Sequence, residues 1–93
     1  MKINHIQGKN KGKIMLYALS TCGWCKKTKA FLKAQNIAFD YIDVDLLEGK
    51  EKDEVVEIIK KWNPRISFPT IVINDETCIT GFDEDKLNGE LNK

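Results

Sequence analysis

An apolar run that leads into two closely spaced cysteines, and then into a helical pattern, is the feature that most restricts the fold of this chain. Residues 13–19 are almost all apolar, which is typical of a central strand covered on both faces. Cys22 and Cys25 follow, and residues 23–35 then carry apolar side chains at helical spacing. The sequence therefore predicts a strand, a turn that carries both cysteines, and a helix that begins at the motif.

The order of the later segments predicts a small α/β domain. Residues 37–44 are a second predicted strand, so the chain contains a strand–helix–strand unit with parallel strands. A second amphipathic helix follows, and Asn63-Pro64 ends it. A hairpin of residues 70–73 and 77–80 and a short C-terminal helix come last. We expect a three-layer α/β sandwich with a mixed four-stranded sheet and three helices.

Length and composition limit the size and the partners of this domain. The chain has 93 residues, of which 42% are apolar, which suits one small folded domain. Residues 1–12 are polar and predict a loosely held N-terminal extension, and residues 13–93 form the domain proper. The 15 basic and 14 acidic residues nearly cancel, so the charge does not support nucleic-acid binding. Without a membrane-length apolar run or signal-peptide features, we expect a cytoplasmic protein that does not act at a membrane.

The two-cysteine motif fits redox chemistry better than a structural metal site. The amide groups at the start of the predicted helix favour an anion, so they favour a thiolate at Cys22. A closed zinc site needs four ligands, and beyond the motif the chain offers only Cys78 and His5. We therefore predict a reactive dithiol of Cys22 and Cys25, with no metal site and no catalytic role for Cys78. The lysines of the helix are interpreted mainly as a solvated face.

A proline at the start of the third predicted strand is the second feature that bears on function. Pro69 follows Phe68 at the first strand position, where no ladder amide is lost, so a purely structural role is sufficient. The alternative is a cis peptide bond, which is uncommon even before proline. A cis bond would turn the backbone of Phe68 outward, where it could pair with an extended thiol substrate.

Taken together, these motifs resemble those of glutaredoxin-like members of the thioredoxin superfamily. The resemblance runs over residues 13–91 and depends on the Cys22–Cys25 motif, on residues 68–70, and on residues 81–83 before the last helix. It implies a thioredoxin-like fold and a thiol-disulfide oxidoreductase of the glutaredoxin type. It also implies Cys22 as the nucleophile, Cys25 as the resolving thiol and Pro69 as a cis residue.

Two departures from the usual glutaredoxin pattern bear on the reductant. Leu19 stands where many glutaredoxins carry a lysine that contacts glutathione, and Thr80-Gly81 replaces a paired glycine. The Gly81-Phe82 pair also resembles small redoxins that supply electrons to ribonucleotide reductase, some of which thioredoxin reductase reduces. The resemblance thus implies glutathione, thioredoxin reductase or both as reductant. The expected targets are proteins with disulfides, including ribonucleotide reductase, and we expect a monomer.

The resemblance also implies a groove for glutathione as co-substrate, with no permanently bound cofactor. We expect Arg65 to reach one carboxylate of the tripeptide, while helix N-terminal amides hold the other. Asp83 could accept from the amine, but it could equally be the cap of the last helix. The predicted substrate-binding residues are Trp24, Arg65, Phe68, Pro69, Gly81, Phe82 and Asp83. The alternative function is carriage of an iron–sulfur cluster between two subunits through Cys22 and glutathione, which the small Gly23 would permit.

Overall fold

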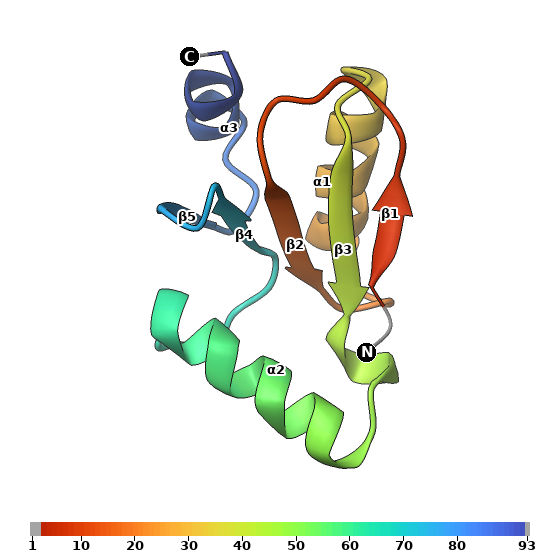
Figure 1. The fold of residues 1–93 in the computed structure, drawn as a ribbon, viewed down its shortest axis with the longest axis vertical. Helices are drawn as coiled ribbons and strands as arrows, with labels where there is room; N and C mark the ends of the chain where they lie inside the picture. The colour runs from red at the N-terminus through yellow and green to blue at the C-terminus, as the bar shows by residue number, and fades with distance from the viewer. Residues whose placement is uncertain (1–2, 93) are drawn as a thin grey trace.

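A five-stranded mixed sheet with helices on both faces forms the computed structural model, which describes residues 3–92. Figure 1 shows the arrangement, with α1 behind the sheet and α2 crossing below it. The elements in chain order are β1 (Asn4–Ile6), β2 (Ile14–Ala18), α1 (Gly23–Ala34), β3 (Phe39–Asp43), a short 3-10 helix (Val44–Leu46), α2 (Gly49–Trp62), β4 (Thr70–Ile73), β5 (Thr77–Thr80) and α3 (Glu84–Leu91). The predicted three-layer α/β sandwich with three helices is confirmed.

The sheet order β1-β3-β2-β4-β5 places β2 at the centre. β2 pairs in parallel with β3 and antiparallel with β4, and β4 continues into the antiparallel hairpin with β5. The carboxyl ends of the two parallel strands therefore lie at the same end of the sheet, where β2 leads into the cysteine motif. In this way the central strand, which is the most apolar segment, carries the candidate site.

The prediction of four strands was one short, because part of the polar N-terminal extension pairs with the sheet. β1 runs antiparallel to β3 at the sheet edge, with His5 opposite Asp40. The His5 Nδ1 and an Asp40 carboxylate oxygen lie 2.6 Å apart. Beyond β1, Gly8 lies against the backbone of residues 36–38, where a Cβ atom would come within 2.7 Å of Ala38 N. Backbone pairing and close approach thus anchor the segment, and the partly buried Ile6 also packs against the core.

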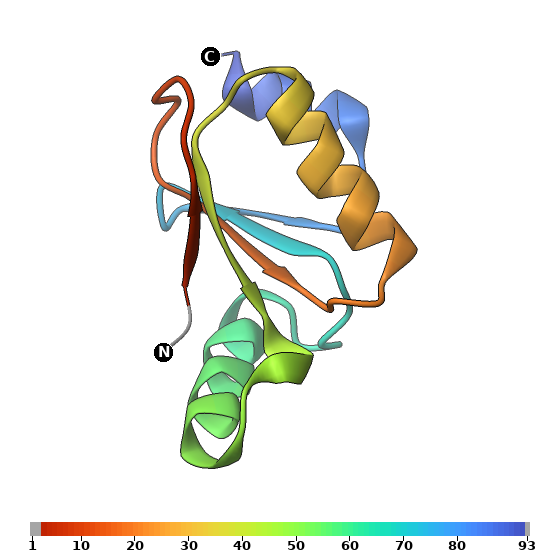
Figure 2. The same ribbon diagram turned by 90° about the vertical axis from the view of Figure 1, so that its right-hand side faces the viewer.

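Two apolar clusters fill the space between the sheet and its helices. Figure 2 shows α1 and α3 on one side of the sheet and α2 on the other. The first cluster joins buried side chains of α1 and α3, including Cys25, Leu32 and Leu87, to one face of β2, β3 and β4. The second joins Val55 and Ile59 of α2 to the opposite face. None of the helices within residues 3–92 is long and apolar enough to cross a membrane.

Element boundaries agree best where the apolar pattern is strong. The hairpin strands have the predicted limits, and α1 ends one residue before the predicted end. The first turns of α2 and the 3-10 helix were not predicted. Residues 49–54 are polar and exposed throughout, so they carry no apolar periodicity that could indicate a helix. Ile58 keeps 37% of its surface exposed, although it follows buried Val55 at the spacing of an apolar stripe.

Candidate functional site

The two motif cysteines lie at the turn from β2 into α1, as predicted. Cys22 is the N-cap of α1, and its Sγ accepts a hydrogen bond from the backbone N–H of Cys25 at 3.2 Å. The backbone N–H of Cys22 donates to the Leu19 carbonyl at 3.2 Å, which closes the turn. A sulfur in this position takes the place of the oxygen of an ordinary capping side chain. The cap therefore fixes the Cys22 sulfur beside the first helical turn.

The two thiols differ strongly in exposure. Cys22 is half-buried, whereas Cys25 has none of its surface exposed. Burial, followed by the hydrogen bond with Cys22, raises the pKa of Cys25 to about 12, while the positive charge of Lys29 acts in the opposite direction. A thiol held in this way is a poor nucleophile towards reagents in solution. The geometry thus makes Cys22 the thiol that a disulfide can reach and Cys25 the thiol covered beneath it.

Aromatic side chains form a platform beside Cys22. Trp24 leaves 57% of its surface exposed and stacks on Phe82, with ring centroids 6.1 Å apart. Phe31 meets Phe82 edge-on at 5.7 Å, and Lys27 Nζ lies 4.8 Å from the Trp24 ring centroid. These contacts bring Trp24 and Phe82, predicted separately as substrate-binding residues, into one surface. Phe82 is the central ring, and the exposed Trp24 on one side of it leaves apolar area open on the surface.

The loop before β4 carries the cis proline and meets the segment before α3. The Phe68–Pro69 peptide bond is cis, as the family resemblance implied. Gly81 N–H donates to the Pro69 carbonyl at 2.8 Å, so two predicted site segments are joined directly. Phe68 is partly buried and packs against both apolar clusters. Gly81 has φ +76°, a conformation that glycine adopts without steric cost.

A small polar network that the sequence did not reveal holds this loop. Asn63 is buried, and its amide donates to Ser67 Oγ at 2.9 Å and to Thr70 Oγ1 at 3.0 Å. Thr70 Oγ1 in turn donates to the Ser67 carbonyl at 2.7 Å. Ile66, between them, has φ +50°, which is rare for a β-branched residue. The network therefore constrains a loop whose backbone would not adopt this path by local preference.

Of the remaining predicted groove residues, Asp83 has a capping role in the structure and Arg65 is a surface residue. Asp83 is the N-cap of α3, and its carboxylate accepts from the Lys86 N–H at 3.1 Å. Phe82 and Leu87 flank this cap and belong to the same apolar cluster, which is the arrangement of a hydrophobic staple. Arg65 is exposed in the loop between α2 and β4. Their roles towards glutathione stay predictions.

Two further contacts surround the motif and were missed at the level of sequence. Ser20 donates through its N–H and its hydroxyl to Asp45, and these bonds lower the pKa of that carboxyl. Lys29, which we interpreted as part of a solvated face, instead forms a largely buried ion pair with Asp43 at 2.9 Å. The sequence did contain one indication that Asp43 is partly buried, because Asp43 shares a strand face with apolar Phe39.

Comparison with known proteins places this geometry in a family. The glutaredoxin family model matches residues 14–78, which include both cysteines and the cis proline. The chain belongs to the glutaredoxin family. A glutaredoxin structure from Methanosarcina mazei is 48% identical with a TM-score of 0.91, covering 100% of this chain and 90% of that one. Methanoredoxin from Methanosarcina acetivorans is 45% identical with a TM-score of 0.88, covering 92% of this chain and 90% of its own.

Among curated relatives, an uncharacterised glutaredoxin-like 8.6 kDa protein of Clostridium pasteurianum is 36% identical over 81 residues. That match covers 86% of this chain and 99% of the relative. Family membership supports a thiol-disulfide oxidoreductase type of role. Within residues 3–92, no group of three or more histidine, cysteine or acidic side chains is arranged to hold a metal ion.

The candidate site lies apart from a cavity at the other end of the sheet. A cavity of about 350 Å³ lies beside Asn10, Asn74 and Glu90. Its lining includes Ile73, which pairs with Ile14 at the amino end of β2, whereas the cysteines follow the carboxyl end. Cys78 of β5 is partly buried, and burial raises its pKa. The motif and this cavity therefore lie at opposite ends of β2.

Proposed function

We propose that this protein is a dithiol–disulfide oxidoreductase that reduces protein disulfides and glutathione mixed disulfides through Cys22 and Cys25. The observation that carries the proposal is the unequal placement of the two sulfurs at the N-terminus of α1. Cys22 is accessible and caps the helix, while Cys25 is fully buried one turn inside it and donates its N–H to the Cys22 sulfur. Cys22 can thus react with a substrate disulfide, and Cys25 can then react with the mixed disulfide that forms at Cys22.

The proposed reaction has two exchange steps. The Cys22 thiolate attacks one sulfur of the target disulfide, forms a mixed disulfide and releases the other target sulfur as a thiolate. Cys25, as thiolate, then attacks the Cys22 sulfur, which closes the Cys22–Cys25 disulfide and releases the second target thiolate. The target gains two electrons, the protein loses two, and the protons of the two cysteines pass to the released thiolates.

We further propose that an extended substrate docks between the platform and the cis-proline loop. Phe68 would offer its backbone to the substrate, with Trp24 and Phe82 on one side and Arg65 on the other. Glutathione is the co-substrate used by the family, and its γ-glutamyl carboxylate would meet the amides at the start of α3. NMR titration of Cys25→Ser with oxidised glutathione tests this groove. Shifts at Arg65, Phe68, Phe82 and Asp83 would support it, and an adduct that perturbs none of them would contradict it.

A coupled turnover assay on a small disulfide tests the function itself. It is run with glutathione and its reductase, and separately with thioredoxin reductase, to identify the reductant. Cys22→Ser should abolish turnover with either system, and Cys78→Ser should leave it unchanged as the matched control. Cys25→Ser should trap a mixed disulfide with a protein target. Full activity in Cys22→Ser would overturn the proposal.

The location, the oligomeric state and the targets of the protein complete the proposal. We propose a cytoplasmic monomer that acts on disulfide-containing proteins, with ribonucleotide reductase among the candidates. The alternative, an iron–sulfur cluster carrier that uses Cys22 and glutathione in a dimer, predicts visible absorption after anaerobic purification and a doubled mass in solution. A colourless monomer that turns over disulfides supports the oxidoreductase.

A further inference from the structure

A largely buried ion pair lies beside the resolving thiol, and the exchange steps described above give it no role. Lys29 Nζ lies 2.9 Å from Asp43 Oδ1, and the two side chains expose only 16% and 14% of their surface. Lys29 Nζ also lies 4.1 Å from the ring centroid of Tyr41, close enough for a cation–π contact. An anion and an aromatic face of β3 thus hold the lysine head group in one place.

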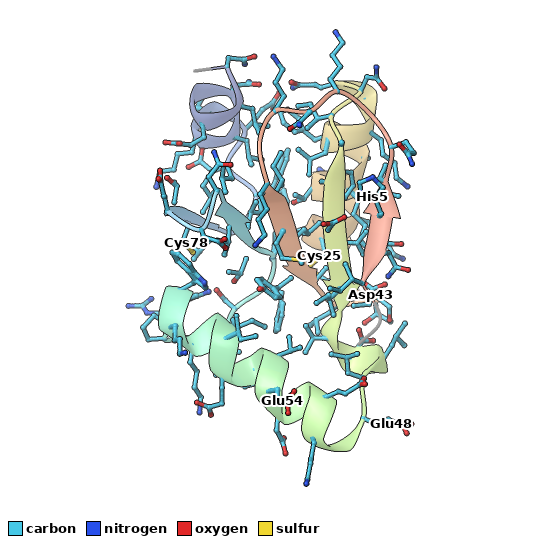
Figure 3. The ribbon with its side chains drawn as sticks, in the orientation of Figure 1. His5, Cys25, Asp43, Glu48, Glu54 and Cys78 are labelled. Carbon is cyan, nitrogen blue, oxygen red and sulfur yellow. The ribbon has the colours of Figure 1, made fainter. Side chains whose placement is uncertain are left out.

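The fold brings this head group towards Cys25. Lys29 follows Cys25 by four residues on α1, so the two side chains lie on the same helical face, one turn apart. Asp43 lies opposite Ala18 at the carboxyl end of β2, the end from which the chain enters the motif. Figure 3 labels Cys25 and Asp43 at this end of the sheet. The charge of Lys29 acts on Cys25 directly and lowers its pKa against the larger effect of burial.

Within residues 3–92, the groups whose charges act on Cys25 are Cys22 and Lys29. Cys22 and Tyr41 are the titratable side chains within the apolar cluster that contains Cys25. Asp43 faces the same region from β3, where Lys29 neutralises it. The other lysines of α1 are exposed. Lys29 is therefore the cation placed to act on the resolving thiol.

We propose that Lys29, held by Asp43 and Tyr41, is a positioning residue that favours the thiolate of Cys25 in the resolving step. This inference rests on the proposed dithiol function. In that step, the Cys25 sulfur forms a bond to the Cys22 sulfur with its own electron pair. The bond between Cys22 and the target sulfur breaks, the target sulfur keeps that electron pair, and the proton lost by Cys25 passes to it.

The test follows the resolving step on its own. Reduced protein in a Cys78→Ser background is mixed with dithiobis-nitrobenzoate, an aromatic disulfide that releases one coloured thiolate in each exchange. The first phase reports attack by Cys22 and the second reports closure by Cys25. Lys29→Met should slow the second phase about threefold at every pH from 6 to 8, because a pKa higher by about one unit removes about nine-tenths of the thiolate while the more basic thiolate is about threefold more nucleophilic. Lys29→Arg, which keeps the charge, should restore most of the rate.

Two controls separate charge from stability. Lys33→Met removes an exposed lysine one turn further along α1 and should leave both phases unchanged. Lys29→Met/Asp43→Asn removes both charges, which avoids an unpaired buried carboxylate, and should be as slow as Lys29→Met. An unchanged second phase in Lys29→Met or in Lys29→Met/Asp43→Asn, or equal slowing by Lys29→Arg, overturns the inference alone. A wild-type protein without a second phase overturns the proposed function and the inference with it.

Discussion

Brief alkylation of the reduced protein at pH 8 should modify Cys22 and leave Cys25 almost untouched. Burial and the hydrogen bond with Cys22 raise the pKa of Cys25 to about 12. With that value roughly one Cys25 in ten thousand is a thiolate at pH 8, against about a quarter of an ordinary cysteine with a pKa of about 8.5. Since the thiolate is the reacting species, the ionisation difference alone slows Cys25 by about three orders of magnitude.

Iodoacetamide labelling of a Cys78→Ser variant measures this difference. Samples quenched at short times are digested with trypsin, which leaves both motif cysteines in one peptide between Lys13 and Lys26. Fragmentation in the mass spectrometer then assigns the label to one sulfur or the other. Initial rates are compared, because modification of Cys22 removes one of the groups that raise the pKa of Cys25.

Labelling in concentrated guanidinium chloride is the matched control, because unfolding exposes both thiols and should make their rates similar. In the folded protein we expect Cys22 to be labelled at least a hundredfold faster than Cys25. Initial rates within a factor of ten of each other under native conditions would refute the reasoning. Preferential labelling of Cys25 would also reverse the assignment of nucleophile and resolving thiol.

Three further predictions concern the loops around the site. Asn63→Ala should lower the free energy of unfolding by about 1–3 kcal/mol in urea titrations, since it leaves two loop hydroxyls without their donor. Asp45→Asn should destabilise the protein at pH 7 and have no effect at a pH below the folded-state pKa of Asp45. The hydrogen bonds from Ser20 lower the pKa of Asp45, so this stabilisation exists above the unfolded-state pKa and disappears as pH falls through the folded one. Gly81→Ala should lower the free energy of unfolding by about 1 kcal/mol, because Gly81 has a positive φ. Gly89→Ala, within α3 and facing open space, should raise it by about 0.5–1 kcal/mol. Equal shifts in the thermal midpoints of the two variants would contradict this.

Strong local patterns made much of the fold predictable. The apolar run of β2, the β-branched hairpin strands and the helical spacing of α1 each indicate one element, and the structure contains them nearly at the predicted limits. The cysteine motif was placed correctly for the same reason, because it lies between a strand and a helix that are both easy to recognise. The cis state of Pro69 was different, since it came from the family resemblance and not from local residues.

Contacts between distant segments could not be predicted in this way. Three residues look like ordinary surface residues in the sequence, yet each forms a polar contact with another segment of the folded chain. Asn63 donates a hydrogen bond to Thr70, Asp43 pairs with Lys29, and Asp45 accepts a hydrogen bond from Ser20. The N-terminal strand was missed because it is held by backbone hydrogen bonds, which any residue except proline can make.

By itself, the sequence determined the layers of this protein, the position of its two motif cysteines and the family to which the chain belongs. These depend on the periodicity and spacing of neighbouring residues along the chain. Only the tertiary structure decided which sulfur is covered, which aromatic rings form the platform, and which lysine lies beside Cys25. Those properties depend on burial and on charges brought together from separate strands and helices, and packing alone sets both.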